Sequence, residues 1–87
     1  MTGKAEKLRE RLNRTRRGFS DKDLYLILMA AGFRCREGKH TVYEHPEHTD
    51  LTTVIPRGQD LAPKYATWVK NLVETLDRRR AEAEDGR

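Results

Sequence analysis

The segment Phe33–Ile55, FRCREGKHTVYEHPEHTDLTTVI, decides the fold because it contains three short runs suited to β-strands. These runs are FRCRE, HTVYE and LTTVI, which combine aromatic and β-branched residues with polar ones. The dipeptide GK and the stretch HPEHTD separate them, and glycine in a two-residue connection is typical of a tight hairpin. We therefore expect an antiparallel three-stranded meander.

Helical patterns flank this segment on both sides. Before it, Ser20 is a suitable helix N-cap with Asp23 three residues later, and Gly32 follows the apolar run where a left-handed terminal residue is expected. After it, Pro63 suits a first helical turn. One apolar helix face then recurs at Tyr65, Trp68, Val69, Leu72, Val73 and Leu76. The order predicts an α+β fold in which two helices cover one face of the sheet.

A further helix is predicted at the N-terminus. Residues 4–16 carry a narrow apolar stripe among charges. Residues 1–17 also hold seven Lys or Arg against two Glu, in a chain of net charge +4, and such a basic cluster attracts polyanions. We divide the chain into a basic helical extension (1–17), a folded domain (18–80) and a charged tail expected to be disordered (81–87).

Size and composition limit the class of protein. A chain of 87 residues suits one domain with a small core. The single cysteine, Cys35, cannot form an intramolecular disulfide, which disfavours a secreted disulfide scaffold. No stretch approaches the roughly 18 apolar residues that a membrane span requires. We expect a soluble, cytoplasmic protein.

The three histidines, His40, His45 and His48, lie close together in the sequence and suggest a metal site. Their spacing is not that of a zinc finger or ribbon, and the chain has no CxxC motif. His45 and His48 flank Pro46 in what we predict to be an exposed turn, and Cys35 is expected to pack in the core. We therefore expect no metal and no other cofactor.

His40 is the histidine best placed for chemistry, because it is predicted to begin a strand directly after a tight turn. Imidazole exchanges protons readily near neutral pH, and Lys39 beside it is a candidate phosphate ligand. The residues alone leave catalysis open, since a lone histidine on a strand also fits an ordinary surface role. The chain has no nucleotide-binding glycine loop and no GxSxG motif. Tyr65 and Trp68 fit the core stripe better than a base-stacking role.

Four segments, FSDKDLYLILMAAGF, REGKHTVYEHP, LTTVIPRG and LAPKYATWVKNLVETL, together resemble the HicA family of small ribonuclease toxins. The likeness covers residues 19–76. The family's motif of glycine, usually serine, histidine and an aromatic residue three positions later stands here as Gly38, Lys39, His40 and Tyr43. Lys39 thus departs from the usual serine. The segment VIPRG matches the family's third-strand exit.

This resemblance implies a fold similar to the double-stranded RNA-binding domain and metal-independent cleavage of mRNA, restrained by a HicB-like antitoxin. His40 takes the position of the catalytic histidine. The implied phosphate ligands are Lys39, Arg57 and Lys64, the last near a helix N-terminus, and the implied turn glycines are Gly38 and Gly58. Two other functions stay open, namely a non-catalytic RNA-binding module and an interaction domain that docks through its N-terminal helix.

Overall fold

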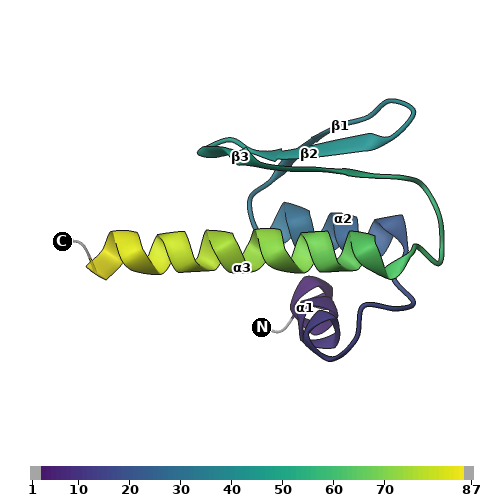
Figure 1. The fold of residues 1–87 in the computed structure, drawn as a ribbon, viewed down its shortest axis with the longest axis horizontal. Coiled ribbons are helices and arrows are strands. Elements are labelled where there is room, and N and C mark those ends of the chain that lie inside the picture. The colour runs from purple at the N-terminus through teal and green to yellow at the C-terminus, as the bar shows by residue number, and fades with distance from the viewer. Residues whose placement is uncertain (1–2, 86–87) are drawn as a thin grey trace.

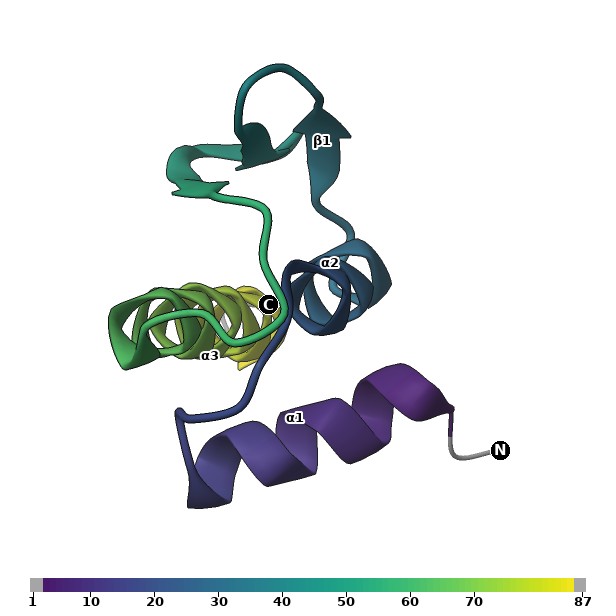
Figure 2. The same cartoon turned by 90° about the vertical axis from the view of Figure 1, so that its right-hand side faces the viewer.

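The computed structural model describes residues 3–85 and contains three α-helices and one three-stranded antiparallel sheet. The helices are α1 (Lys4–Arg14), α2 (Asp21–Ala30) and α3 (Pro63–Asp85), and the strands are β1 (Arg34–Arg36), β2 (Thr41–His45) and β3 (His48–Ile55). Figure 1 shows α2 and α3 on one side of the sheet. Figure 2 shows α1 crossing the far side of that helix pair. The predicted α+β class and element order are confirmed.

The sheet has the strand order β1-β2-β3, and its register decides which side chains face the helices. Tyr43 pairs with Cys35 of β1 and with Thr53 of β3, and Tyr43 and Thr53 are buried. Because side chains alternate along a strand, the neighbouring pair Val42 and Val54 faces away, and Val54 is exposed. Cys35 is half-buried and packs against the core, close to its predicted role.

Both turns of the sheet differ from the prediction. Strand β1 ends at Arg36 and β2 begins at Thr41, so the first connection comprises residues 37–40 rather than a two-residue turn. The second connection is shorter than predicted, because β2 continues to His45 and β3 begins at His48. A register shift between Glu44 and His45 accompanies it. The two histidines that we expected in an exposed turn are therefore strand residues.

Helix α2 begins and ends where the sequence predicts. The Ser20 Oγ accepts the Asp23 N–H, and the Asp23 carboxylate accepts the Ser20 N–H, both at 3.1 Å. This reciprocal pair satisfies two backbone donors at the helix start. Gly32 has a φ of 96°, the left-handed conformation that ends a helix and that favours glycine. The buried face of α2 consists of Leu24, Ile27 and Leu28.

Helix α3 packs on the core with a face displaced from the predicted one. Its buried residues are Ala66, Val69, Val73 and Leu76. Trp68 is 44% exposed, so its assignment to the core was wrong, and Tyr65 is only partly buried. The helix also continues through Asp85, because the run of Arg, Ala and Glu favours helix. Residues 81–85 are thus helical rather than disordered, and residues 86 and 87 lie outside the described chain.

Helix α1 is integrated into the same core. Its buried residues are Leu8 and Leu12, which belong to one cluster with the apolar residues of α2 and α3. Arg9 forms an ion pair with Asp77 of α3 at 2.7 Å. The Arg11 guanidinium lies 4.5 Å from the centre of the Phe19 ring, a cation–π contact. The division predicted at residue 17 therefore does not separate two structural units.

Candidate active site

The β1–β2 turn lies at one end of the molecule, together with the first turns of α2 and α3 (Figure 1). All of its residues, 37–40, are exposed, and His40 directly precedes β2. The structure thus places His40 in the turn itself rather than at the strand start that we predicted, with Lys39 exposed beside it. Both side chains are open to a ligand that approaches from solvent.

Strand pairing brings Arg57 to the same end. Thr41, the first residue of β2, pairs with Ile55, and Arg57 follows Ile55 by two residues. The loop that carries Arg57 is fixed to the start of α2, because the Asp21 N–H donates to the Gly58 carbonyl at 2.9 Å. The Gly58 N–H donates in turn to the Asp21 carboxylate at 3.5 Å. The exposed Arg57 side chain therefore extends from an anchored backbone.

The two glycines expected to support this end differ in what they do. A Cβ on Gly58 would lie 3.0 Å from Leu61 Cδ2, so glycine there allows the β3–α3 loop to pack closely. The Leu61 N–H also ties this loop to the Phe19 carbonyl at 2.9 Å. Gly38 has no positive φ, and within the described part of the chain a Cβ there would meet only the His40 carbonyl, at 3.7 Å. The turn conformation therefore does not require glycine at position 38.

Lys64 lies at the same end, in the first turn of α3. Its Nζ is 5.2 Å from the centre of the Tyr65 ring and 5.8 Å from that of Trp68, distances that allow cation–π attraction. The structure thus gathers Lys39, His40 and Arg57 around the β1–β2 turn. It places Lys64 nearby, with its ammonium group over the aromatic side chains of α3.

Beside the turn, the surface is hollowed between α2 and the sheet. This hollow has a volume of about 380 Å³, and its lining includes Asp21, Tyr25, Glu37, Thr41, Tyr43 and Arg57. Burial raises the pKa of the Tyr43 hydroxyl far above its ordinary value, and nearby acidic groups, Cys35 first, raise it further. The hydroxyl therefore stays protonated. The sequence reasoning did not single out Tyr25, Asp21 or Glu37.

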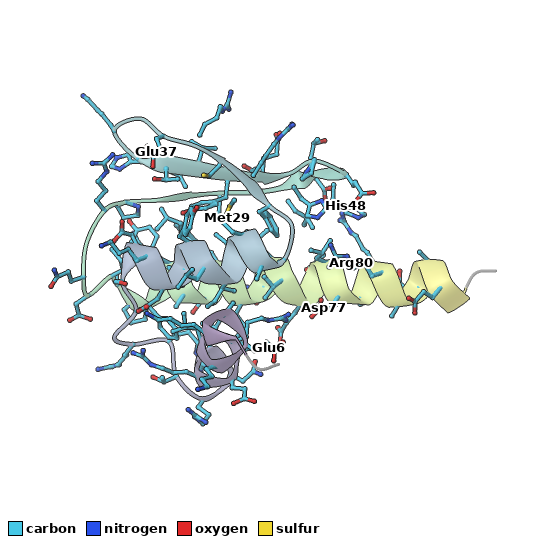
Figure 3. The ribbon with its side chains drawn as sticks, turned by 180° about the vertical axis from the view of Figure 1, so that it is seen from behind. Glu6, Met29, Glu37, His48, Asp77 and Arg80 are labelled. Carbon is cyan, nitrogen blue, oxygen red and sulfur yellow. The ribbon has the colours of Figure 1, made fainter. Side chains whose placement is uncertain are left out.

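The three histidines do not form a cluster. His45 lies at the opposite end of β2, about 16 Å along the strand from His40. There its ring contacts that of His48, with centroids 5.2 Å apart. Figure 3 shows His48 and Arg80 at the end of the sheet opposite to Glu37. Across residues 3–85, no three His, Cys, Asp or Glu side chains are grouped so that they could hold a metal ion.

His45 is a buried polar residue that the sequence reasoning missed. Its side chain is 1% exposed, its Nδ1 accepts the Glu47 N–H at 3.1 Å, and its Nε2 has no hydrogen-bond partner among residues 3–85. Burial lowers the pKa of His45, and the neighbouring charges of His48 and Arg80 lower it further. The Glu47 carboxylate counters these effects on the pKa, and the Ala31 carbonyl does so less strongly. That carbonyl is outside bonding geometry from Nε2 and accepts a bond from Arg80 at 3.1 Å.

Acidification is expected to destabilise the protein through His45. Its pKa in the folded state lies below the ordinary value of about 6.5, so the unfolded chain binds more protons and stability falls as the pH drops below about 6.5. The free energy of unfolding, measured with urea between about pH 7.5 and about pH 5, should fall by up to about 1.4 kcal/mol per pH unit. Asp50, whose pKa Arg79 lowers through a hydrogen bond, titrates in a more acidic range.

The variant His45→Leu should show a flatter pH dependence, because it replaces the buried imidazole with an apolar side chain. His40→Ala, which removes an exposed histidine, should keep the pH dependence of the unaltered protein. The same slope in His45→Leu and in the unaltered protein would show that His45 is not the group responsible.

Comparison of the chain with protein-family models, with curated proteins and with solved structures gives no match in any of the three. Within the described residues 3–85, no helix has both the length and the apolar character needed to cross a membrane.

Proposed function

We propose that this chain is a histidine-dependent endoribonuclease toxin of the HicA type, which cleaves mRNA in the cytoplasm and is restrained by a HicB-like antitoxin. The observation that carries the proposal is the exposed His40 in the β1–β2 turn, flanked by Lys39 and Arg57. The order of helix, three antiparallel strands and helix supports it, because double-stranded RNA-binding domains have the same order.

The charges at this end favour an RNA ligand. Five exposed basic residues lie there: Arg17 in the α1–α2 linker, Lys22 in α2, Lys39 in the turn, Arg57 in the β3–α3 loop and Lys64 in α3. Four acidic residues lie among them, namely Asp21, Asp23, Glu37 and Asp60, and the Asp23 carboxylate is engaged in the cap of α2. A local excess of positive charge attracts phosphodiesters and supplies most of the affinity of non-specific nucleic-acid binding.

The proposed reaction uses a nucleophile that RNA itself carries. His40 accepts the proton of a ribose 2′-hydroxyl, and the 2′-oxygen then attacks the adjacent phosphorus. The bond from phosphorus to the 5′-oxygen of the next nucleotide breaks, and water donates a proton to that leaving oxygen. Lys39 and Arg57 stabilise the negative charge that develops on the phosphorus oxygens. Water is a weak acid, so turnover is expected to be slow.

Analysis of the product ends tests this function. Purified protein incubated with RNA should give fragments with 2′,3′-cyclic phosphate and 5′-hydroxyl ends, at the same rate with and without EDTA, because no step requires a metal ion. Fragments with 5′-phosphate ends, or activity that EDTA abolishes, would point to a different mechanism. RNA that stays intact at high protein concentration would reject the nuclease.

Non-catalytic RNA binding by the same surface is the second candidate, and the exposed cations favour it as well. It requires an RNA affinity that falls steeply with salt, without cleavage. Docking through α1, the third function considered, has less support because Leu8 and Leu12, the apolar stripe of that helix, face the core. Only the polar face of α1 is open to a partner.

A further inference from the structure

The hollow beside the β1–β2 turn has features that the cleavage reaction does not use. Its walls come from the start of α2, from Glu37 of the turn and from Arg57. It also includes Thr41, the residue directly after His40. When the ribose of a nucleotide lies at His40, its base is therefore close enough to enter this hollow. Figure 3 shows Glu37 at that end of the sheet.

Tyr25 gives the hollow an aromatic wall. Its side chain is 41% exposed, although it sits on a helix whose other face is buried. The ring of Tyr25 meets that of Tyr43 edge-on, with centroids 6.4 Å apart and an interplanar angle of 64°, and Tyr43 is only 2% exposed. An exposed ring supported by a buried one is a rigid surface on which a base can stack at little cost in conformational entropy.

Glu37 supplies the polar part of the hollow. Within residues 3–85 its carboxylate takes part in none of the salt bridges, whereas the Asp21 carboxylate accepts the Gly58 N–H. The two oxygens of a carboxylate can accept hydrogen bonds from two adjacent N–H donors. Among the RNA bases, guanine alone presents such a pair on one edge, at N1 and at the exocyclic amino group N2.

We propose that this hollow binds a guanine base of the RNA, with Tyr25 as the stacking surface and Glu37 as the acceptor of the N1 and N2 protons. The inference rests on RNA as the ligand in the proposed function, but not on cleavage. Adenine and cytosine each offer one amino group and uracil only its N3 proton, so the expected order of affinity is guanine, then adenine and cytosine, then uracil.

Nucleotide titrations test the site directly. The four nucleoside 3′-monophosphates are added in turn to the full-length, ¹⁵N-labelled protein, and amide shifts are followed by NMR. Guanosine 3′-monophosphate should bind at least about tenfold more tightly than uridine 3′-monophosphate and should shift the amides of Tyr25, Glu37 and Thr41. Tyr25→Ala should weaken its binding by about 5- to 150-fold, which corresponds to the loss of one stacking partner.

Three further variants make the result specific. Tyr25→Phe keeps the aromatic ring and should bind guanosine 3′-monophosphate about as tightly as the unaltered protein. Trp68→Ala removes an aromatic side chain of similar exposure, 44%, from the groove between β3 and α3, and should leave the preference for guanine over uracil unchanged. Glu37→Gln should reduce the preference for guanine over uracil, because its amide offers one acceptor oxygen in place of two.

The outcomes separate this inference from the nuclease. Equal affinity for all four nucleotides, or shifts that map to the Trp68 groove, would overturn the guanine site even if RNA is cleaved. Guanine-selective binding that depends on Tyr25, in a protein that leaves RNA intact, would support the site and reject the nuclease.

Discussion

Replacing His40 with alanine is expected to lower the rate of RNA cleavage by about 10²- to 10⁴-fold, the usual contribution of a positioned proton-transfer group. Because His40 is exposed and lies in a turn, the substitution should leave the free energy of unfolding within about 0.5 kcal/mol of its original value. The loss should therefore lie in chemistry rather than in folding. The measurement is RNA decay with purified protein, together with growth after induced expression in cells.

A second histidine provides the matched control for that experiment. His48→Gln removes an imidazole at the far end of the sheet, where it contacts His45, and should leave the cleavage rate unchanged. Equal RNA decay in His40→Ala and in the unaltered protein would reject His40 as the catalytic group. Parallel loss of activity in both variants, with lowered stability, would indicate that the assay reports folding.

Replacing Leu12 with alanine is expected to lower the free energy of unfolding by about 2–5 kcal/mol. The side chain is 1% exposed and belongs to the same core cluster as the apolar residues of α2 and α3, so its truncation removes buried apolar surface and leaves a cavity. For a domain with a total stability of about 5–15 kcal/mol, this is a large fraction. Urea unfolding followed by circular dichroism measures it.

Asn13→Ala is the control for Leu12→Ala, because Asn13 is the next residue of the same helix and is exposed. Its effect should stay within about 0.5 kcal/mol. If Leu12→Ala lowered the free energy of unfolding no more than Asn13→Ala does, α1 would contribute little to the stability of the folded domain. Deletion of residues 1–17 would then leave a stable protein, as the predicted division into extension and domain requires.

Local signals in the sequence predicted the helix starts well, whereas the buried face of α3 shows where such signals fail. The apolar series from Tyr65 to Leu76 contains two overlapping stripes. The one that reaches the core includes Ala66, a small residue that hydropathy patterns under-weight. The other includes Trp68, which lies in the groove along β3. Only the tertiary arrangement of helix and sheet decides between them.

The burial of His45 could have been found from the sequence. Residues alternate between the two faces of a strand, so extending β2 beyond Tyr43 by two positions places His45 on the same inward face. Pro46 and the charged residues after it favoured an early turn instead. The hollow was less accessible to prediction, because Tyr25 and Glu37 belong to different elements and meet only when the sheet packs on α2.

The anchoring of the β3–α3 loop links the site to the order of folding events. The β1–β2 hairpin is a local structure and can form early, within microseconds. The contact between Asp21 and Gly58 spans 37 residues, and contacts between distant residues are expected to form later than local ones. The loop that carries Arg57 is therefore anchored to α2 only once the domain has folded. In the proposed function, a chain that emerges from the ribosome has its catalytic turn before its Arg57 loop is anchored, so full activity is expected only after that loop has been joined to α2.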